Sequence, residues 1–187
     1  RVVVQDDGGV LNGGVDTTVQ SFTVIVDPVA DTPSITSSMT YEDTTTTTGL
    51  VISRNVVDGE EVSHFKITEI SNGRLYRQDD GVVEIGEGEF ISYAAGSIGL
   101  LFEPFPDFNG IGSFKIHAST GVGESFLGGD EVLAEITVIA VNDEPTLSAI
   151  SDPSAILEDA LEQTINLSGI TSGAGNEVQA LSVRVES

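Results

Sequence analysis

The sequence predicts an all-β fold, and three features of the chain support that prediction. Gly, Thr, Val, Ile and Ser dominate the composition, and strong helical patterns are missing. Short runs in which apolar and polar residues alternate recur along the chain. Asn-Gly and Asp-Gly pairs, which favour tight turns, separate these runs. Strands this short, at this spacing, are typical of a sandwich or a barrel and not of a parallel α/β sheet.

The expected strands follow one another from the N-terminus. The first covers 21–26, where Phe22, Val24 and Val26 share one face. Later strands are expected at 50–52, 65–70, 73–76, 90–93, 100–102, 114–118 and 134–138. Turns are expected at Asp58-Gly59, Asn72-Gly73, Asp80-Gly81 and Asn109-Gly110. Residues 156–163 have a helix-favouring composition, but the segment is short and stands where the first strand of a repeat should fall, so we expect no helix there.

An internal repeat organises the chain. Residues 24–33 match residues 136–145 at an offset of 112 residues, and each copy ends in Pro. Because a Pro cannot donate to a central ladder, it suits the step from the last strand of one unit to the first strand of the next. Two further matches occur at an offset of 116 residues: Glu42-Asp43 with Glu158-Asp159, and 59–62 with 175–178.

The repeat predicts three parts. Residues 1–33 are expected to be the C-terminal part of a preceding repeat, 34–145 a complete repeat, and 146–187 the N-terminal part of a following one. A unit of about 110 residues has the size of an immunoglobulin-like sandwich. We therefore expect β-sandwich repeats in tandem, one complete and flanked by two partial ones.

The composition narrows the choice of partners. The chain carries 30 acidic and 7 basic side chains, so its net charge is −23. Nucleic acid needs clustered Lys and Arg, which are few and scattered here, and an anionic membrane surface is disfavoured too. The surplus favours a hard divalent cation such as Ca²⁺, although a halophilic surface would explain the same charge. The absence of Cys excludes disulfides, zinc–thiolate sites and iron–sulfur clusters, and no apolar run approaches the ~20 residues of a transmembrane helix.

Three short motifs stand in order at repeat spacing. A strand leads into Asn142-Asp143-x-Pro145, with a weaker Asp31-x-Pro33 one repeat earlier, and a Glu-Asp pair follows each Pro. The segment 104–110, Pro-Phe-Pro-Asp-Phe-Asn-Gly, precedes the strand that contains Phe114. Together the motifs resemble the cadherin-like tandem repeats, which are immunoglobulin-like β-sandwiches, of large bacterial surface and secreted adhesin-type proteins. The resemblance implies an extracellular rod of seven-stranded sandwiches that often binds Ca²⁺ at its junctions and serves cell adhesion or spacing.

The resemblance also implies which residues hold Ca²⁺ at the first junction. Cadherins use an Asp six residues before the junction Pro, and Asp27 stands there. Glu42 resembles their first-strand Glu, and the Asp6-Asp7 pair resembles their Asp-rich loop. The candidate ligands at the first junction are therefore Asp6, Asp7, Asp27, Asp31 and Glu42, with Asp58 as a further contributor from a later loop.

The second junction departs from this pattern. Its candidate ligands are Asn142, Asp143 and Glu158, while Ala118-Ser119 stands where Asp6-Asp7 stands one repeat earlier. We expect weaker Ca²⁺ binding there, unless an acid of the Gly-rich loop compensates: Glu124, Asp130 or Glu131. For both junctions, acidic turns that hold no ordered ion are the alternative interpretation.

The expected function is that of a non-catalytic structural or adhesion module. His64 and His117 are placed outward by strand alternation, and no nucleophile elbow is present. One alternative is a carbohydrate-binding accessory module of a secreted enzyme, with Tyr41, Tyr76 and Tyr93 as its platform. Another is an extracellular filament subunit completed by strand exchange. The expected partners are neighbouring repeats of the same or identical chains, and cell-surface or matrix glycans.

Overall fold

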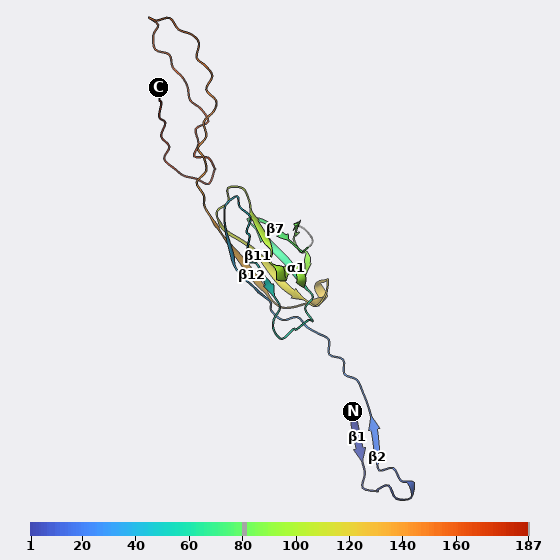
Figure 1. Cartoon of the computed structure of the whole chain (residues 1–187). Coiled ribbons are helices and arrows are strands. Elements are labelled where there is room, and N and C mark those ends of the chain that lie inside the picture. Colours follow the sequence, from blue (N-terminus) through green and yellow to red (C-terminus); the bar gives the residue numbers. More distant parts are fainter. Residues whose placement is uncertain (80–81, 187) are drawn as a thin grey trace.

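The computed structural model describes residues 1–79 and 82–186. Figure 1 shows a central part with a slender segment extending from each end. Strands outnumber helices among the described elements, so the all-β prediction is confirmed. Every buried apolar side chain in this described part of the chain lies between Ala30 and Val138. The hydrophobic core therefore belongs to the central part.

The elements follow in chain order. The N-terminal segment holds a hairpin of β1 (Val2–Gln5) and β2 (Thr17–Gln20), with the short 3₁₀ helix η1 (Leu11–Gly13) between them. The elements of the central part are β3 (Ser34–Ile35), β4 (Ser38–Tyr41), β5 (Ile52–Ser53), β6 (His64–Ser71), β7 (Gly73–Arg77), β8 (Val83–Glu84), β9 (Phe90–Ser92), α1 (Tyr93–Ile98), β10 (Leu101–Pro104), β11 (Gly110–Ser119), the 3₁₀ helix η2 (Glu124–Phe126) and β12 (Leu127–Ile139).

Two sheets and one short strand pair make up the central part. The larger sheet has the order β4-β12-β11-β6-β9, the smaller sheet has the order β10-β7-β8, and β3 pairs with β5. Neighbours in the larger sheet are antiparallel except β4 and β12, which run parallel with Tyr41 opposite Ile139. Because these two strands run in the same direction, the residues that follow each of them emerge at the same end of the central part.

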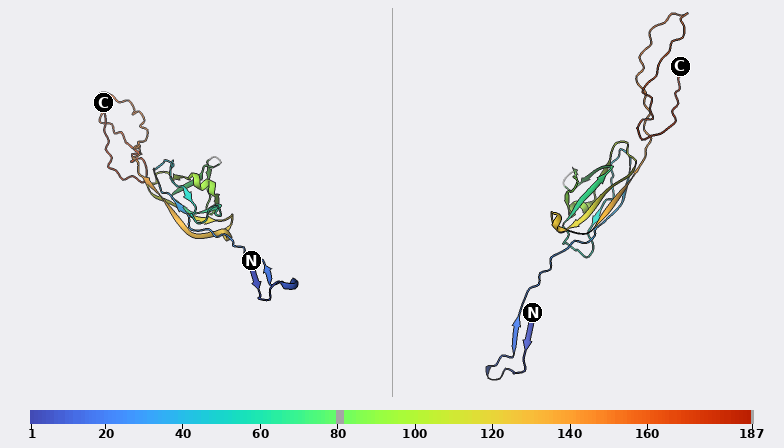
Figure 2. Two further views of the ribbon diagram at one scale, coloured as in Figure 1. Left: turned by 60° about the horizontal axis from the view of Figure 1, so that its bottom comes forward. Right: turned by 180° about the vertical axis from the view of Figure 1, so that it is seen from behind.

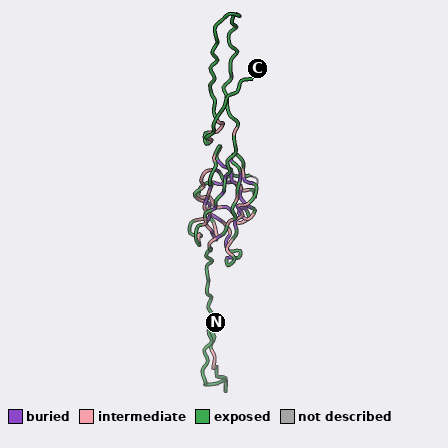
Figure 3. Tube along the Cα trace, turned by 90° about the vertical axis from the view of Figure 1, so that its left-hand side faces the viewer, coloured by how far each residue is buried: buried purple, intermediate pink, exposed green. Residues whose placement is uncertain are grey.

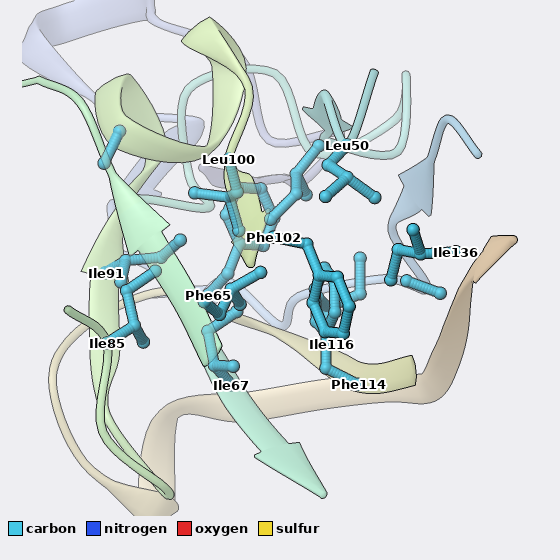
Figure 4. Packing of buried hydrophobic residues seen from close by; sticks show 14 of the residues in the cluster. Leu50, Phe65, Ile67, Ile85, Ile91, Leu100, Phe102, Phe114, Ile116 and Ile136 are labelled. Atoms are coloured by element: carbon cyan, nitrogen blue, oxygen red, sulfur yellow. The ribbon is translucent and has the colours of Figure 1, made fainter. Parts of the chain in front are cut away.

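The core joins side chains from both sheets. Figure 4 shows Phe65 of β6, Phe102 of β10 and Phe114 of β11 in one buried cluster. The predicted alternation on β11 is confirmed, because Ile116 is fully buried while His117 remains partly exposed. Each large apolar side chain buried in this way contributes roughly 1.5–3 kcal/mol to stability. The cluster therefore holds the two sheets together.

The segments outside the central part extend away from it (Figure 2) and are mostly exposed (Figure 3). The prediction of a strand at 21–26 is wrong, because within the described residues 21–33 contain no strand. Phe22, Val24 and Val26 are 64%, 70% and 85% exposed. An alternating run becomes a strand only where a neighbour completes its ladder, and this run has no such neighbour among the described residues.

One helix arises where strand residues were expected. β9 ends at Ser92, whose hydroxyl accepts a hydrogen bond from the Ala95 backbone N–H, 3.1 Å away, and caps α1. Six residues are too few for a periodic signal, so the sequence pattern could not reveal this helix. Residues 156–163 contain a turn and, in the described structure, no helix, as expected. The turn expected at Asp80-Gly81 lies outside the described residues.

Candidate metal centre

Two junctions connect the central part to the flanking segments. The first junction is residues 27–33 with the residues they contact, and the second junction is residues 140–145 with theirs. The Asp130 backbone N–H donates to the Thr32 hydroxyl at 2.8 Å, which places the first junction beside the start of β12. The Glu42 backbone N–H donates to the Ile139 carbonyl at 2.9 Å, which places Glu42 at the end of β12.

Glu42 therefore belongs to the second junction, and its expected place at the first junction is wrong. Asp130 lies at the first junction, and Ile139 lies nine residues further along β12. Nine residues span about 30 Å along a strand, so the two positions are far apart. The physical reason is that residues 34–41, which include β3 and β4, carry the chain roughly 25 Å along the central part before Glu42 is reached. Asp130 is likewise at the first junction, so it cannot compensate at the second.

Asp6 and Asp7 are also not brought to the first junction. The strand β1 points away from the central part, and the chain returns along β2 (Figure 1). The loop between the two strands therefore lies at the far end of the hairpin, where the Asp6 backbone N–H donates to the Asp16 carbonyl at 2.9 Å. Asp27 is exposed in the extended linker. A loop that precedes the last strand faces away from the linker that follows that strand.

Glu158 is remote from the second junction for a similar reason. Hydrogen bonds between three pairs of residues hold the C-terminal segment in a long loop: Thr146 with Thr171, Ser148 with Ser168, and Ser154 with Gln163. Glu158 lies at the closed end of that loop, ten residues beyond Ser148 and roughly 30 Å away along an extended chain. Its expected place beside Asn142 and Asp143 is therefore wrong.

Three carboxylates meet at the second junction: the expected Asp143 and two that the expected ligand sets omit. One oxygen from each of Asp43, Asp107 and Asp143 lies within 4.8 Å of the other two. Asp43 follows β4, Asp107 precedes β11, and Asp143 belongs to the linker after β12. The Asp107 backbone N–H donates to Asp43 Oδ1 at 3.0 Å, which ties the two loops together. The parallel pairing of β4 with β12 creates this meeting point.

The segment beyond the linker closes the second junction from the other side. The Asp143 backbone N–H donates to Glu177 Oε1 at 2.9 Å. The Asn176 amide donates to Glu42 Oε2 at 2.7 Å and to Asn109 Oδ1 at 3.1 Å. These groups surround a hollow of 300 Å³ lined by Glu42, Asn109, Ala140, Val141, Asn142, Asn176, Glu177 and Gln179. Oxygen atoms from four separate segments therefore converge on one place.

The second junction contains carboxylate oxygens that lack a partner. Asp143 Oδ2 and Glu177 Oε2 are buried and accept no hydrogen bond from any described residue. Burial, and then the negative charges of Glu177, Asp107, Asp43 and Glu42, raise the pKa of Asp143 above its ordinary value. Leaving such oxygens unpaired costs free energy, and a divalent cation with oxygen ligands would remove that cost. The residues present fit Ca²⁺.

The first junction repeats one part of this arrangement. The Asp31 backbone N–H donates to Asp58 Oδ1 at 3.0 Å, just as the equivalent Asp143 donates to Glu177. Asp58 is 3% exposed, and its second oxygen is also buried without a partner among the described residues. Burial is the main cause that raises the pKa of Asp58, and the charge of Asp31 adds to it.

The sequence contained signals for residues that the expected ligand sets omit. Asp43 belongs to the repeated Glu-Asp pair, and Asp107 belongs to the 104–110 motif. Glu177 stands in the repeat match of 175–178 with 59–62. The sequence does not show at which end of the central part each of these motifs lies.

The three Tyr expected as a sugar platform lie on different elements. Tyr41 is on β4 of the larger sheet, and Tyr76 is on β7 of the smaller one. Tyr93 begins α1, where its ring packs 6.2 Å from Phe65 and beneath the Arg54 guanidinium. The structure does not bring these rings onto one face.

Comparison with protein-family models, curated proteins and solved structures finds no match to this chain. Among the described residues there is no helix of the length and apolar character needed to cross a membrane. Any statement about function must therefore come from the residues and their geometry.

Proposed function

We propose that the chain is a non-catalytic segment of an extracellular rod built from cadherin-like β-sandwich repeats, and that Ca²⁺ bridges its junctions. Residues 34–145 form the complete repeat in this proposal. One observation carries it: at both junctions a linker Asp donates its N–H to a carboxylate further along the chain, and that carboxylate keeps a buried oxygen with no partner among the described residues. The two linker Asp residues are repeat equivalents, and the carboxylates that accept from them, Asp58 and Glu177, lie within three residues of equivalent positions. This similarity supports tandem units with a shared junction design.

Ca²⁺ would act by replacing repulsion with attraction. Carboxylates within 4.8 Å of one another repel, and the partial burial of Asp143 strengthens that repulsion. A cation that binds them joins the turn after β4, the loop before β11, the linker and the segment around Glu177. Each bound segment loses freedom to move relative to the others, so the junction stiffens. A mechanical role in extension, presentation or adhesion follows from stiff junctions between repeats.

The extracellular location is part of the same proposal. Extracellular Ca²⁺-binding modules typically have dissociation constants of about 10⁻⁴–10⁻³ M, which matches a site with a few carboxylates and several neutral oxygens. The expected partners are the neighbouring repeats, with cell-surface or matrix glycans as binding targets of the rod. A net charge of −23 also keeps such a rod soluble.

A calcium titration tests the proposal. We expect isothermal calorimetry to detect Ca²⁺ binding at millimolar concentrations or below, and small-angle scattering to report a stiffer molecule with Ca²⁺ than with chelator. The Asp152→Asn variant is the matched control, because it removes one exposed carboxylate of the C-terminal segment. An absence of binding heat at millimolar Ca²⁺, or a response lost equally in the control, would contradict the proposal.

A further inference from the structure

The outer face of the smaller sheet carries two adjoining hollows. One has a volume of 350 Å³ and is lined by Asp43, Arg74, Glu103, Pro104, Phe105 and Pro106. The other has a volume of 480 Å³, shares Arg74 and Phe105, and extends to Ile85 and Glu87. Both fall within the range of about 300–1,000 Å³ that is common for small-molecule sites. Arg74 and Phe105 stand between them.

The polar groups of this face are held by the strand register. Glu103 of β10 lies opposite Arg74 of β7, and both point outward while Leu75 and Phe102 are buried beneath them. The Tyr76 hydroxyl donates to Glu103 Oε2 at 2.6 Å, and this bond raises the pKa of Tyr76. The Arg74 side chain is 58% exposed, with its guanidinium 3.9 Å from Glu84. Donors and acceptors therefore stand side by side at the surface.

The apolar group is an aromatic ring on a fixed backbone. Phe105 is 48% exposed between two prolines. Its backbone N–H donates to the Asn72 carbonyl at 3.1 Å, and its carbonyl accepts from the Phe108 N–H at 3.0 Å. An exposed ring on a backbone held in this way offers a flat apolar surface at a modest entropic cost.

We propose that this face, from Asp43 across Arg74 and Phe105 to Glu87, binds an uncharged saccharide. The C–H face of a pyranose ring fits an exposed aromatic ring, and its hydroxyls pair with neighbouring guanidinium and carboxylate groups. The charge of the face selects neutral sugars. Asp43, Glu87 and Glu103 outnumber Arg74, so an acidic sugar would be repelled.

The saccharide site adjoins the proposed metal centre. Asp43 lines the first hollow and is also one of the three clustered carboxylates. Its bond from the Asp107 N–H ties it to the loop that carries Phe105. An ion at that cluster should order this wall of the hollow, so we expect tighter saccharide binding with Ca²⁺. This dependence rests on the function proposed above, whereas the binding face itself does not.

The test is a calorimetric titration of the full chain with four hexasaccharides, in Ca²⁺ and in chelator. Cellohexaose, laminarihexaose and maltohexaose are the neutral probes, and hexagalacturonate is the acidic one. We expect at least one neutral probe to bind and the acidic probe to fail. Phe105→Ala and Arg74→Ala should each weaken binding about tenfold. Phe126→Ala is the matched control, because Phe126 is also 48% exposed but lies on η2.

The outcomes separate this inference from the metal proposal. If no neutral probe binds in either buffer, or if Phe126→Ala weakens binding as much as Phe105→Ala, the saccharide site is wrong whatever the Ca²⁺ titration shows. The proposal is also overturned if hexagalacturonate is the only saccharide that binds. It is overturned as well if an oligolysine peptide binds and Phe105→Ala abolishes that binding. If a neutral probe binds equally in Ca²⁺ and chelator, the saccharide site stands and its coupling to the metal centre fails.

Discussion

The two junctions hold their linker Asp in the same way but differ in what surrounds it. Asp31 donates its N–H to Asp58, and Asp143 donates its N–H to Glu177. At the second junction, Asp43 and Asp107 approach from the central part, and the Glu42 carboxylate bonds to the segment beyond the linker. At the first junction, the hairpin upstream turns its acids away. A cation site of this kind needs contributions from both neighbours of the linker.

The runs that lead into the junctions differ as well. Ile136, on β12, is fully buried, whereas its repeat equivalent Val24 is 70% exposed. The two runs have the same alternating pattern, but only β12 lies between two partner strands. Similar alternating runs therefore form a core strand in one place and, in the other, a linker with no strand partner among the described residues.

The largest expected effect separates these two runs. Ile136→Ala should lower the free energy of unfolding by roughly 2–5 kcal/mol, because it leaves a cavity between the sheets. Val24→Ala should change it by less than about 0.5 kcal/mol, because an exposed side chain loses no packing. Urea denaturation followed by circular dichroism measures both. Equal losses would mean that the run before the first junction is packed after all.

A smaller effect should separate Glu42 from its repeat equivalent Glu158. Glu42 accepts from the Val141 backbone N–H and from Asn176, and it is buried. Glu42→Ala should therefore cost about 1–3 kcal/mol of unfolding free energy in chelator. Glu158→Ala, at the exposed end of the C-terminal loop, should leave stability unchanged. Thermal denaturation of both variants makes the comparison. If Glu42→Ala leaves stability unchanged, the Glu42 contacts at the second junction do not stabilise the fold.

Ca²⁺ affinity should distinguish the two linker Asp residues. Asp143→Asn removes a charged oxygen from the three-carboxylate cluster, so it should weaken Ca²⁺ binding about tenfold. Asp31→Asn should leave the affinity of the second junction unchanged, because Asp31 lies at the other end of β12. Calorimetry on both variants provides the measurement. If Asp31→Asn proves the more damaging change, the first junction is the principal site.

The pH dependence of stability should be the smallest effect. Burial raises the pKa of Asp58 and of Asp143, so both bind protons more tightly in the folded state than in the unfolded one. In chelator, these two groups should therefore make unfolding harder as the pH falls from 7 toward 5. This contribution is isolated by comparing the wild type with a double variant that carries both Asp58→Asn and Asp143→Asn. The denaturation midpoint of each protein is measured at pH 7 and at pH 5. If acidification stabilises the wild type no more than the double variant, Asp58 and Asp143 do not make this contribution.

Much of the fold could be predicted from local patterns. Buried positions such as Ile67, Phe114 and Ile136 follow from alternation, because successive side chains of a strand face opposite sides. The helix α1 could not be predicted, since one capping Ser and six residues leave no periodic signal. Asn142 and Asp143 belong to the second junction by their place in the chain, but only the structure brings Asp43, Asp107, Glu177 and Glu42 to the same junction.

Composition, alternation and the internal repeat are properties of the chain read in one dimension. They were sufficient for an all-β core and for the acidic surplus of −23. Which acids share a junction was settled by strand direction. Residues 34–41, which include β3 and β4, run along the central part from the first junction toward the second, so Glu42 is near the first linker in sequence and beside the second in space. The parallel pairing of β4 with β12 arises from long-range contacts that no local pattern records, and it is what gathers the carboxylates.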